Sequence, residues 1–245
     1  MRFNGLKAYL KYKLGFTAGL PAFVINGVKE CENNEPLVDI KNADVVLFFG
    51  DRLKNEKQVL LRKSVAEKIV NASKKLPKAV FFIIYDAFRS LEHQQSLWNK
   101  KYEYFKNMYP SETEDQITAR TKRVVADPRR GHGGHQTGGA IDIGLCDQNG
   151  VELDMGAPYS GTGQAIRTKS EVNEEAKRNR KILCDLMKNY GFVNYPNEWW
   201  HFCYGDRMWA AYSMKKNCCY GLVTNQKFDP KTSVLLSKEA ARSRS

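Results

Sequence analysis

The sequence has no run of 18 or more uncharged apolar residues, so it predicts no transmembrane helix. Its six cysteines include no C-x-x-C pair, which argues against a zinc cluster and a thioredoxin-type site. Zinc-finger spacing, an aromatic-glycine RNA-binding signature and a heptad zipper are also missing. These absences exclude integral membrane proteins and common nucleic-acid modules. They favour a globular chain with no nucleic-acid partner.

The formal net charge of +12 comes from 39 Lys and Arg residues against 27 Asp and Glu residues. This excess of positive charge favours an anionic partner, of which a cell-wall polymer is one example. The alternative is that the lysines only form a solvated surface. Basic residues between positions 2 and 13 precede an apolar stretch, as in a signal peptide, but Pro21 interrupts that stretch and no clear cleavage site follows. We therefore expect a cytoplasmic location, or a periplasmic or exported one if a leader has been removed.

Apolar periodicity divides the first half of the chain into short strands and amphipathic helices. Residues 37–40 and 45–49 are expected to be extended, and residues 57–75 to form a helix with a lysine-rich outer face. The β-prone run at residues 79–85 predicts a central strand buried on both faces. Ser90 is suited to cap the helix that follows.

The second half of the chain is also expected to contain both helices and strands. A capping box is expected at Ser111, residues 127–139 form a glycine-rich loop, and residues 140–145 predict a strand. The last elements are expected to be a helix, two strands joined by a turn at Pro196-Asn197, and irregular chain after Tyr212; the helix and the strands span residues 171–190, 192–194 and 199–204. This mixture indicates the α+β class.

Residues that bind metals gather where loops meet strands. His135-x6-Asp142 and Glu198-Trp-Trp-His201 together offer two histidines and two carboxylates. Two histidines and one carboxylate leave a fourth position open, as in catalytic zinc sites. A carboxylate near the metal but not bound to it suits a general base, and the turn before Glu198 allows it to converge with His201.

Each of these residues also has a plain structural explanation. Arg89, just after the predicted central strand, is placed to stabilise developing negative charge, but it can equally be a salt-bridge partner. His135 can be a loop residue, Asp142 can brace a turn, and His201 can be a core histidine. Spacing alone leaves these alternatives open.

The motifs at these positions resemble those of zinc D-Ala-D-Ala dipeptidases of the vancomycin-resistance type, within the wider family of D,D-carboxypeptidases and cell-wall peptidases. The family pattern Ser-x-His-x-x-Gly-x-Ala-x-Asp resembles residues 133–142, Gly-Gly-His-Gln-Thr-Gly-Gly-Ala-Ile-Asp. The pattern Glu-x-x-His is similar to residues 198–201, and residues 85–89 resemble the segment that bears the family's arginine. The resemblance extends over residues 154–156 and 191–206, and runs overall from about residue 37 to residue 212.

This resemblance implies one Zn²⁺ per chain, held by His135, Asp142 and His201. It further implies that Glu198 is the general base and that Arg89 stabilises the oxyanion.

The resemblance also implies a single α+β domain in which a central, mainly antiparallel sheet carries the zinc site and helices flank it. We expect this catalytic domain at residues 34–213, between an N-terminal extension at 1–33 and a polar tail at 214–245.

Two departures concern the substrate. Gly133 stands where the family has serine, and Ser160, after Tyr159, stands where an aspartate grips the substrate ammonium. We expect hydrolysis of D-Ala-D-Ala or a closely related short D-amino-acid dipeptide. The alternative within peptidases is a D,D- or L,D-carboxypeptidase or endopeptidase acting on peptidoglycan stem peptides. A non-catalytic zinc-bearing binding module is a third reading, against which Glu198 and Arg89 argue. The oligomeric state does not follow from the sequence.

Overall fold

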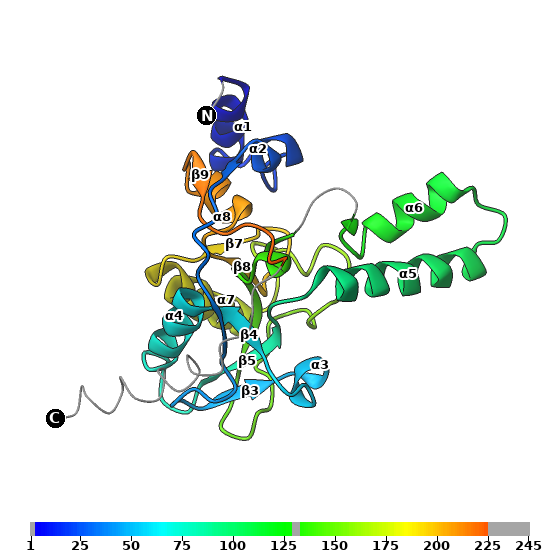
Figure 1. Ribbon diagram of the computed structural model, residues 1–245. Helices are drawn as coiled ribbons and strands as arrows, with labels where there is room; N and C mark the ends of the chain where they lie inside the picture. Colours follow the sequence, from blue (N-terminus) through cyan, green and yellow to red (C-terminus); the bar gives the residue numbers. More distant parts are fainter. Residues whose placement is uncertain (1–2, 129–132, 225–245) are drawn as a thin grey trace.

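The computed structural model describes residues 3–128 and 133–224, and its helices and strands form an α+β fold (Figure 1). The elements in chain order are α1 Phe3–Lys13, α2 Ala22–Asn26, β1 Lys29–Glu30, β2 Leu37–Asp39, β3 Leu47–Phe49, α3 Asp51–Lys54, β4 Leu60–Arg62, α4 Lys63–Ser73, β5 Phe81–Asp86, α5 Leu91–Met108, α6 Glu114–Lys122, the 3₁₀ helix η2 Gly134–Thr137, β6 Ala140–Cys146, α7 Glu174–Asn189, β7 Val193–Asn194, β8 His201–Cys203, α8 Arg207–Tyr212 and β9 Asn217–Cys218.

A five-stranded sheet in the order β3-β5-β6-β8-β7 forms the centre of the fold. Strand β3 runs parallel to β5, while the β5–β6, β6–β8 and β7–β8 pairs are antiparallel, so the sheet is mixed. Two small sheets, antiparallel β2–β4 and parallel β1–β9, accompany it. The α+β class is therefore confirmed, with a mixed sheet at its centre.

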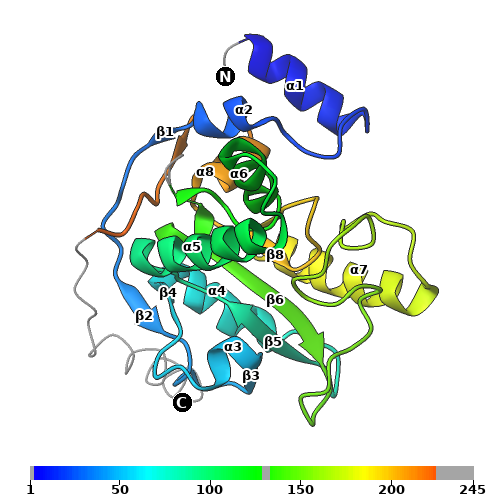
Figure 2. The ribbon, with the colours of Figure 1, turned by 90° about the vertical axis from the view of Figure 1, so that its right-hand side faces the viewer.

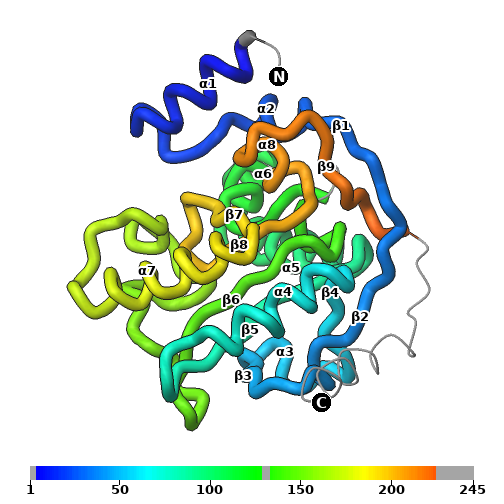
Figure 3. The backbone as a smooth tube through the Cα atoms, turned by 90° about the vertical axis from the view of Figure 1, so that its left-hand side faces the viewer, coloured from blue at the N-terminus to red at the C-terminus, as the bar shows by residue number. Residues whose placement is uncertain are grey.

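Helices cover both sides of this sheet. Helices α4 and α7 lie on one side, and the α5–α6 hairpin projects from the other (Figures 1, 2 and 3). All seven residues of β6 are buried, as are five of the six in β5. The β5 run was expected to be buried on both faces, and the structure confirms it.

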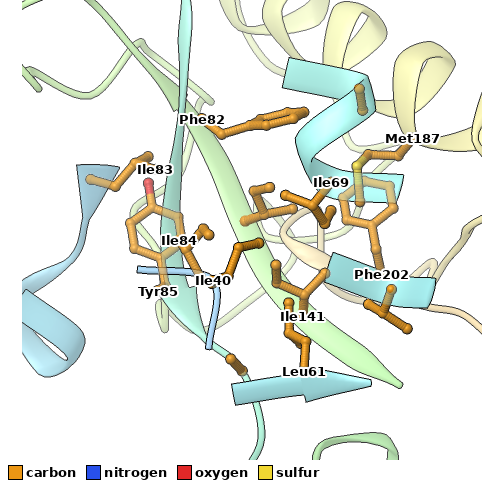
Figure 4. Close-up of a cluster of buried hydrophobic side chains, with 14 of the residues drawn as sticks. Ile40, Leu61, Ile69, Phe82, Ile83, Ile84, Tyr85, Ile141, Met187 and Phe202 are labelled. Atoms are coloured by element: carbon orange, nitrogen blue, oxygen red, sulfur yellow. The ribbon is translucent and has the colours of Figure 1, made fainter. Parts of the chain in front are cut away.

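The main hydrophobic core lies between the sheet and helices α4 and α7 (Figure 4). Ile69 of α4 and Met187 of α7 meet Phe82 of β5, Ile141 of β6 and Phe202 of β8, and each of these side chains is at most 1% exposed. The strands that carry the functional residues are thus held by close-packed apolar side chains.

A second core joins the start of the chain to its C-terminal part. Leu20 and Val24, next to and within α2, pack with Ala210 and Tyr212 of α8. The backbone N–H of Leu20 donates to the Tyr212 hydroxyl at 3.0 Å. The N-terminal segment therefore packs against the rest of the fold. In the described part of the chain, none of the helices is both apolar enough and long enough to cross a bilayer.

The predicted helix at residues 57–75 is wrong in its first part. Residues 60–62 form β4, which pairs with β2 so that Leu61 lies opposite Val38, and α4 begins only at Lys63. The buried Arg62 guanidinium donates to the Thr137 carbonyl and pairs with Glu32. The short apolar run of residues 59–61 fits both the helical and the extended period, so the spacing did not distinguish the two.

Two further expectations need correction. The capping box of α6 is formed by Thr113 and Gln116, two residues later than expected, because the Gln116 side chain accepts from the Thr113 N–H at 2.8 Å. The chain after Tyr212 is not wholly irregular, since Asn217–Cys218 forms β9 and Tyr220 is 1% exposed. Residues 225–245 of the expected tail lie outside the described residues, and the division into three segments remains a prediction.

Other local predictions are confirmed. Ser90 caps α5, where its side chain accepts from the His93 N–H at 3.2 Å. Helix α7 ends before Gly191, whose φ of +85° is a left-handed conformation that glycine adopts without strain. The turn at Pro196-Asn197 separates β7 from β8.

Candidate metal centre

Three side chains predicted to bind a metal come together on and beside the interior strands β6 and β8 of the central sheet. His135 lies on η2, just before β6, while Asp142 is on β6 and His201 opens β8. In the β6–β8 pairing, Asp142 lies directly opposite His201, which puts both side chains on the same face. One ligand atom from each of the three residues lies within 4.8 Å of the other two.

Hydrogen bonds fix how the two imidazoles face the carboxylate. His135 Nδ1 donates to the Ala87 carbonyl at 2.8 Å, which leaves Nε2 facing Asp142 Oδ1 at 3.3 Å. In His201 the two ring nitrogens have the opposite roles. Its Nε2 contacts Cys203 Sγ at 3.2 Å, which leaves Nδ1 2.8 Å from the same Asp142 oxygen. One nitrogen of each imidazole therefore points toward the same anionic oxygen.

This arrangement is suited to a cation. Two imidazole nitrogens and a buried carboxylate that converge can share a cation, whose positive charge compensates the buried negative charge. The burial of Asp142 would raise its pKa, but the charges and hydrogen bonds of His135 and His201 outweigh burial and hold the pKa well below its ordinary value. Two histidines and one carboxylate, with room for a further ligand, are the donor set of catalytic zinc sites.

Glu198 lies beside this cluster without belonging to it. It sits in the turn before β8, where its backbone N–H donates to the Tyr195 carbonyl at 3.0 Å, so it is off the regular strand as predicted. Burial raises the pKa of its carboxyl group, and the charge of Asp142 raises it further, while His201 and His135 lower it. The carboxyl group is thus close enough to the cluster to respond electrostatically to all three residues.

Arg89 approaches from the end of β5. Its backbone N–H donates to the His135 carbonyl at 3.2 Å, and its guanidinium donates to the carboxylate of Asp86 and, at 2.7 Å, to Gln94 Oε1. Burial lowers the pKa of Arg89, and Asp142, Tyr159 and Glu198 raise it. Within the described chain, its buried Nε has no hydrogen-bond partner, which leaves a donor available near the cluster.

Several residues of the site were not predicted. The Tyr159 hydroxyl donates to Asp142 Oδ2 at 3.2 Å, and its ring stacks on Tyr85 with 4.3 Å between the centroids. Asp86 pairs with both Arg52 and Arg89, and it is fully buried. A charged residue at the end of an apolar strand signals such a role, but its partners come from distant segments and cannot be read from spacing.

The two positions that depart from the family pattern differ in their surroundings. Gly133 precedes η2, and its N–H donates to Gln136 Oε1 at 2.7 Å. Ser160 is exposed in the loop after Tyr159 and has a φ of +58°. Its side chain therefore carries no negative charge at the position where the family pattern has an aspartate.

Comparisons with known proteins place this chain in a family. The model of the peptidase M15 family, described as D-Ala-D-Ala dipeptidase, matches residues 38–228. The chain belongs to this family. It is thus a member of a metallopeptidase family, as the resemblance of its motifs predicted, and His135, Asp142 and His201 form a possible site for a metal ion.

Individual relatives carry related names. A D-alanyl-D-alanine dipeptidase of Synechocystis is 35% identical over 88 residues, which are 31% of this chain and 36% of that protein. A D-alanyl-D-alanine dipeptidase of Escherichia coli is 28% identical over 167 residues, or 67% of this chain and 77% of that protein. The chain thus spans about a third of the first relative and about three quarters of the second.

Among solved structures, the vancomycin-resistance D,D-pentapeptidase VanY, in complex with Zn(II), is 18% identical with a TM-score of 0.42. That match covers 78% of this chain and 96% of VanY.

Proposed function

We propose that the protein hydrolyses D-Ala-D-Ala or a closely related short D-amino-acid dipeptide, with one Zn²⁺ held by His135, Asp142 and His201. The observation that carries the proposal is the convergence of two imidazole nitrogens on Asp142, with the Glu198 carboxyl group beside them. When bound there, zinc would supply the Lewis acidity that lowers the pKa of a water molecule. We assign the catalytic domain to residues 34–213.

Glu198 is the general base in this proposal. Its carboxylate accepts a proton from the attacking water and passes it to the leaving amine of the dipeptide. Burial supports this role, since it raises the pKa of the carboxyl group and so brings proton affinity closer to what both transfers require. A carboxylate that only bound the metal would belong to the cluster, whereas Glu198 lies beside it.

Arg89 stabilises the negative charge that develops on the carbonyl oxygen. Its guanidinium is held by Asp86 and Gln94, and its charge interacts with Asp142 and Glu198. A donor that is already oriented needs little reorganisation during the reaction, which makes its hydrogen bond more effective in the transition state. The Nε atom, for which the described residues offer no hydrogen-bond partner, is a further donor on the same side chain.

The substrate assignment rests on the relatives named D-alanyl-D-alanine dipeptidase. A second candidate is a D,D- or L,D-carboxypeptidase or endopeptidase acting on peptidoglycan stem peptides. The exposed, neutral Ser160 favours it, because an uncharged residue cannot select for the free ammonium of a dipeptide.

The test combines zinc content with turnover of D,D-, L,D- and L,L-dipeptides and of purified muropeptides. The wild-type protein is expected to contain one zinc ion per chain and to cleave D-Ala-D-Ala in preference to muropeptides. Glu198→Gln should keep the zinc and lose about 10²–10⁴-fold in kcat. Glu103→Gln, an exposed change on α5, is the matched control. Normal turnover by Glu198→Gln would remove the base from the proposal, and cleavage of muropeptides alone would favour the second candidate.

A further inference from the structure

Helix α1 has two faces of different character. Ala8, Tyr9 and Tyr12 lie on the face that packs against the second core, where the Tyr12 ring meets Tyr212 edge-on with 5.1 Å between the centroids. The opposite face carries Leu6 and Leu10, one helical turn apart, which are 41% and 51% exposed. The helix is therefore fixed to the protein along one side and presents leucines to solvent along the other.

The exposed leucines continue into a larger apolar patch. Leu14 and Phe16, which follow the helix, are 71% and 76% exposed, and Phe23 of α2 is 58% exposed. Five of the eleven exposed large apolar residues in the described chain lie in this segment, so they are concentrated rather than scattered. We call Leu6, Leu10, Leu14, Phe16 and Phe23 the apolar face. Helix α1 lies at the outer edge of the molecule in all three views (Figures 1, 2 and 3).

Positive charge borders the apolar face on both sides. With 100° per residue, Lys7 and Lys11 follow one border of the leucine stripe and Lys13 lies on the other border. All three lysines are exposed. The first acidic residue of the sequence is Glu30, so no negative charge from this segment offsets them.

We propose that this segment docks the protein on the surface of a lipid bilayer that contains anionic lipids. The apolar face inserts at the boundary between headgroups and acyl chains, and the lysines pair with lipid phosphates, as in interfacial amphipathic helices. An anionic sugar polymer would satisfy the lysines but leave the leucines in water. A second copy of the chain would bring the same lysines together. Peripheral docking needs no membrane-spanning helix.

The experiment is sedimentation of the full chain with vesicles of phosphatidylcholine alone or with 30% phosphatidylglycerol. The wild-type protein is expected to bind the anionic vesicles on the order of 100-fold more tightly, and the difference should shrink as salt is added. Leu6→Ser with Leu10→Ser and Leu14→Ser, which spares the buried face of α1, should weaken binding at least about 10-fold. Exchange of the three lysines for glutamine should remove the preference for anionic vesicles.

Val46→Ser with Val151→Ser is the matched control, because these residues are also exposed and apolar but lie elsewhere. This control variant should bind vesicles like the wild-type protein. Unchanged melting temperatures would show that all variants fold. The proposal is overturned if the leucine variant binds as tightly as the wild type. Retention on cell-wall polymer that depends on the lysines alone would also overturn it, as would a leucine-dependent dimer without vesicle binding.

Discussion

The guanidinium of Arg89 donates a hydrogen bond to the carboxylate of Asp86, three residues earlier on β5. Asp86 is fully buried and also pairs with Arg52, so one carboxylate orients two arginines. We expect Asp86→Asn to lower kcat about 10²-fold with zinc content unchanged, because a misdirected guanidinium no longer meets the developing charge. Loss of a buried counter-charge should also reduce stability by about 3 kcal/mol.

Steady-state kinetics and thermal melting of Asp86→Asn test these effects. The control variant is Arg52→Gln, which removes the other arginine that pairs with Asp86. Its kcat should stay within a few-fold of the wild-type value. Wild-type kcat in Asp86→Asn would show that Arg89 does not depend on this carboxylate.

The Cys203 thiol orients a proposed zinc ligand. His201 Nε2 contacts Cys203 Sγ at 3.2 Å, and the thiol donates onward to Met208 Sδ at 3.7 Å. Cys203→Ala leaves the imidazole N–H without this acceptor, so we expect zinc affinity to fall about 10-fold or more. Competition with a chromophoric chelator measures the effect. Cys203→Ser keeps an acceptor and should be milder, and Cys184→Ala on α7 should bind zinc normally. Equal affinities in all three would contradict the role.

Ser160 offers a test of substrate choice. The residue is exposed and has a φ of +58°, a conformation that Asp and Asn adopt more readily than most residues. Ser160→Asp is expected to lower KM for D-Ala-D-Ala about 10-fold, because a charge-assisted hydrogen bond to the ammonium is gained. Ser160→Asn has the same shape without the charge and should show no such gain. If both variants behave alike, the position does not contact the ammonium.

Glu198, the proposed general base, also affects stability. Burial raises its pKa in the folded protein above that of the unfolded chain, so the native state binds this proton more tightly. The resulting stabilisation is complete below the unfolded pKa of about 4.3 and is lost as pH rises through the folded pKa. In zinc-free protein, Glu198→Gln should therefore raise Tm by about 2–4 °C at pH 7, the effect of ~1 kcal/mol in a domain of this size. Melting curves from pH 4 to pH 8 should show the gain disappearing toward pH 4. A gain that does not vary with pH would have another cause.

The sequence was most informative where burial and chemistry coincide. The strand at residues 81–86 and the strand that carries Asp142 are nearly continuous apolar runs, because helices cover both faces of the sheet. His135, Asp142 and His201 could be predicted to meet because the motifs resemble those of a known family. The spacing of these residues in the sequence did not by itself show that the three side chains lie together.

The rest depends on contacts between distant segments. Residues 60–62 have no local signal that separates strand from helix, and only the pairing with β2 decides it. Tyr159 and Cys203 acquire their roles through contacts with Asp142 and His201, which periodicity does not encode. The position of α1 likewise follows from a tyrosine pair that joins residues 12 and 212.

Asp86, Asp142 and His201 stand opposite one another on three neighbouring strands, with a bulge just before Asp86. Side chains alternate between the two faces of a strand, so a slip of one residue in β6 or β8 would turn a proposed ligand to the wrong face. Capture of the metal ion therefore reports that the strands have aligned correctly. We expect a misfolded chain not to retain zinc, so metal retention can be used as a sensitive check on refolded protein.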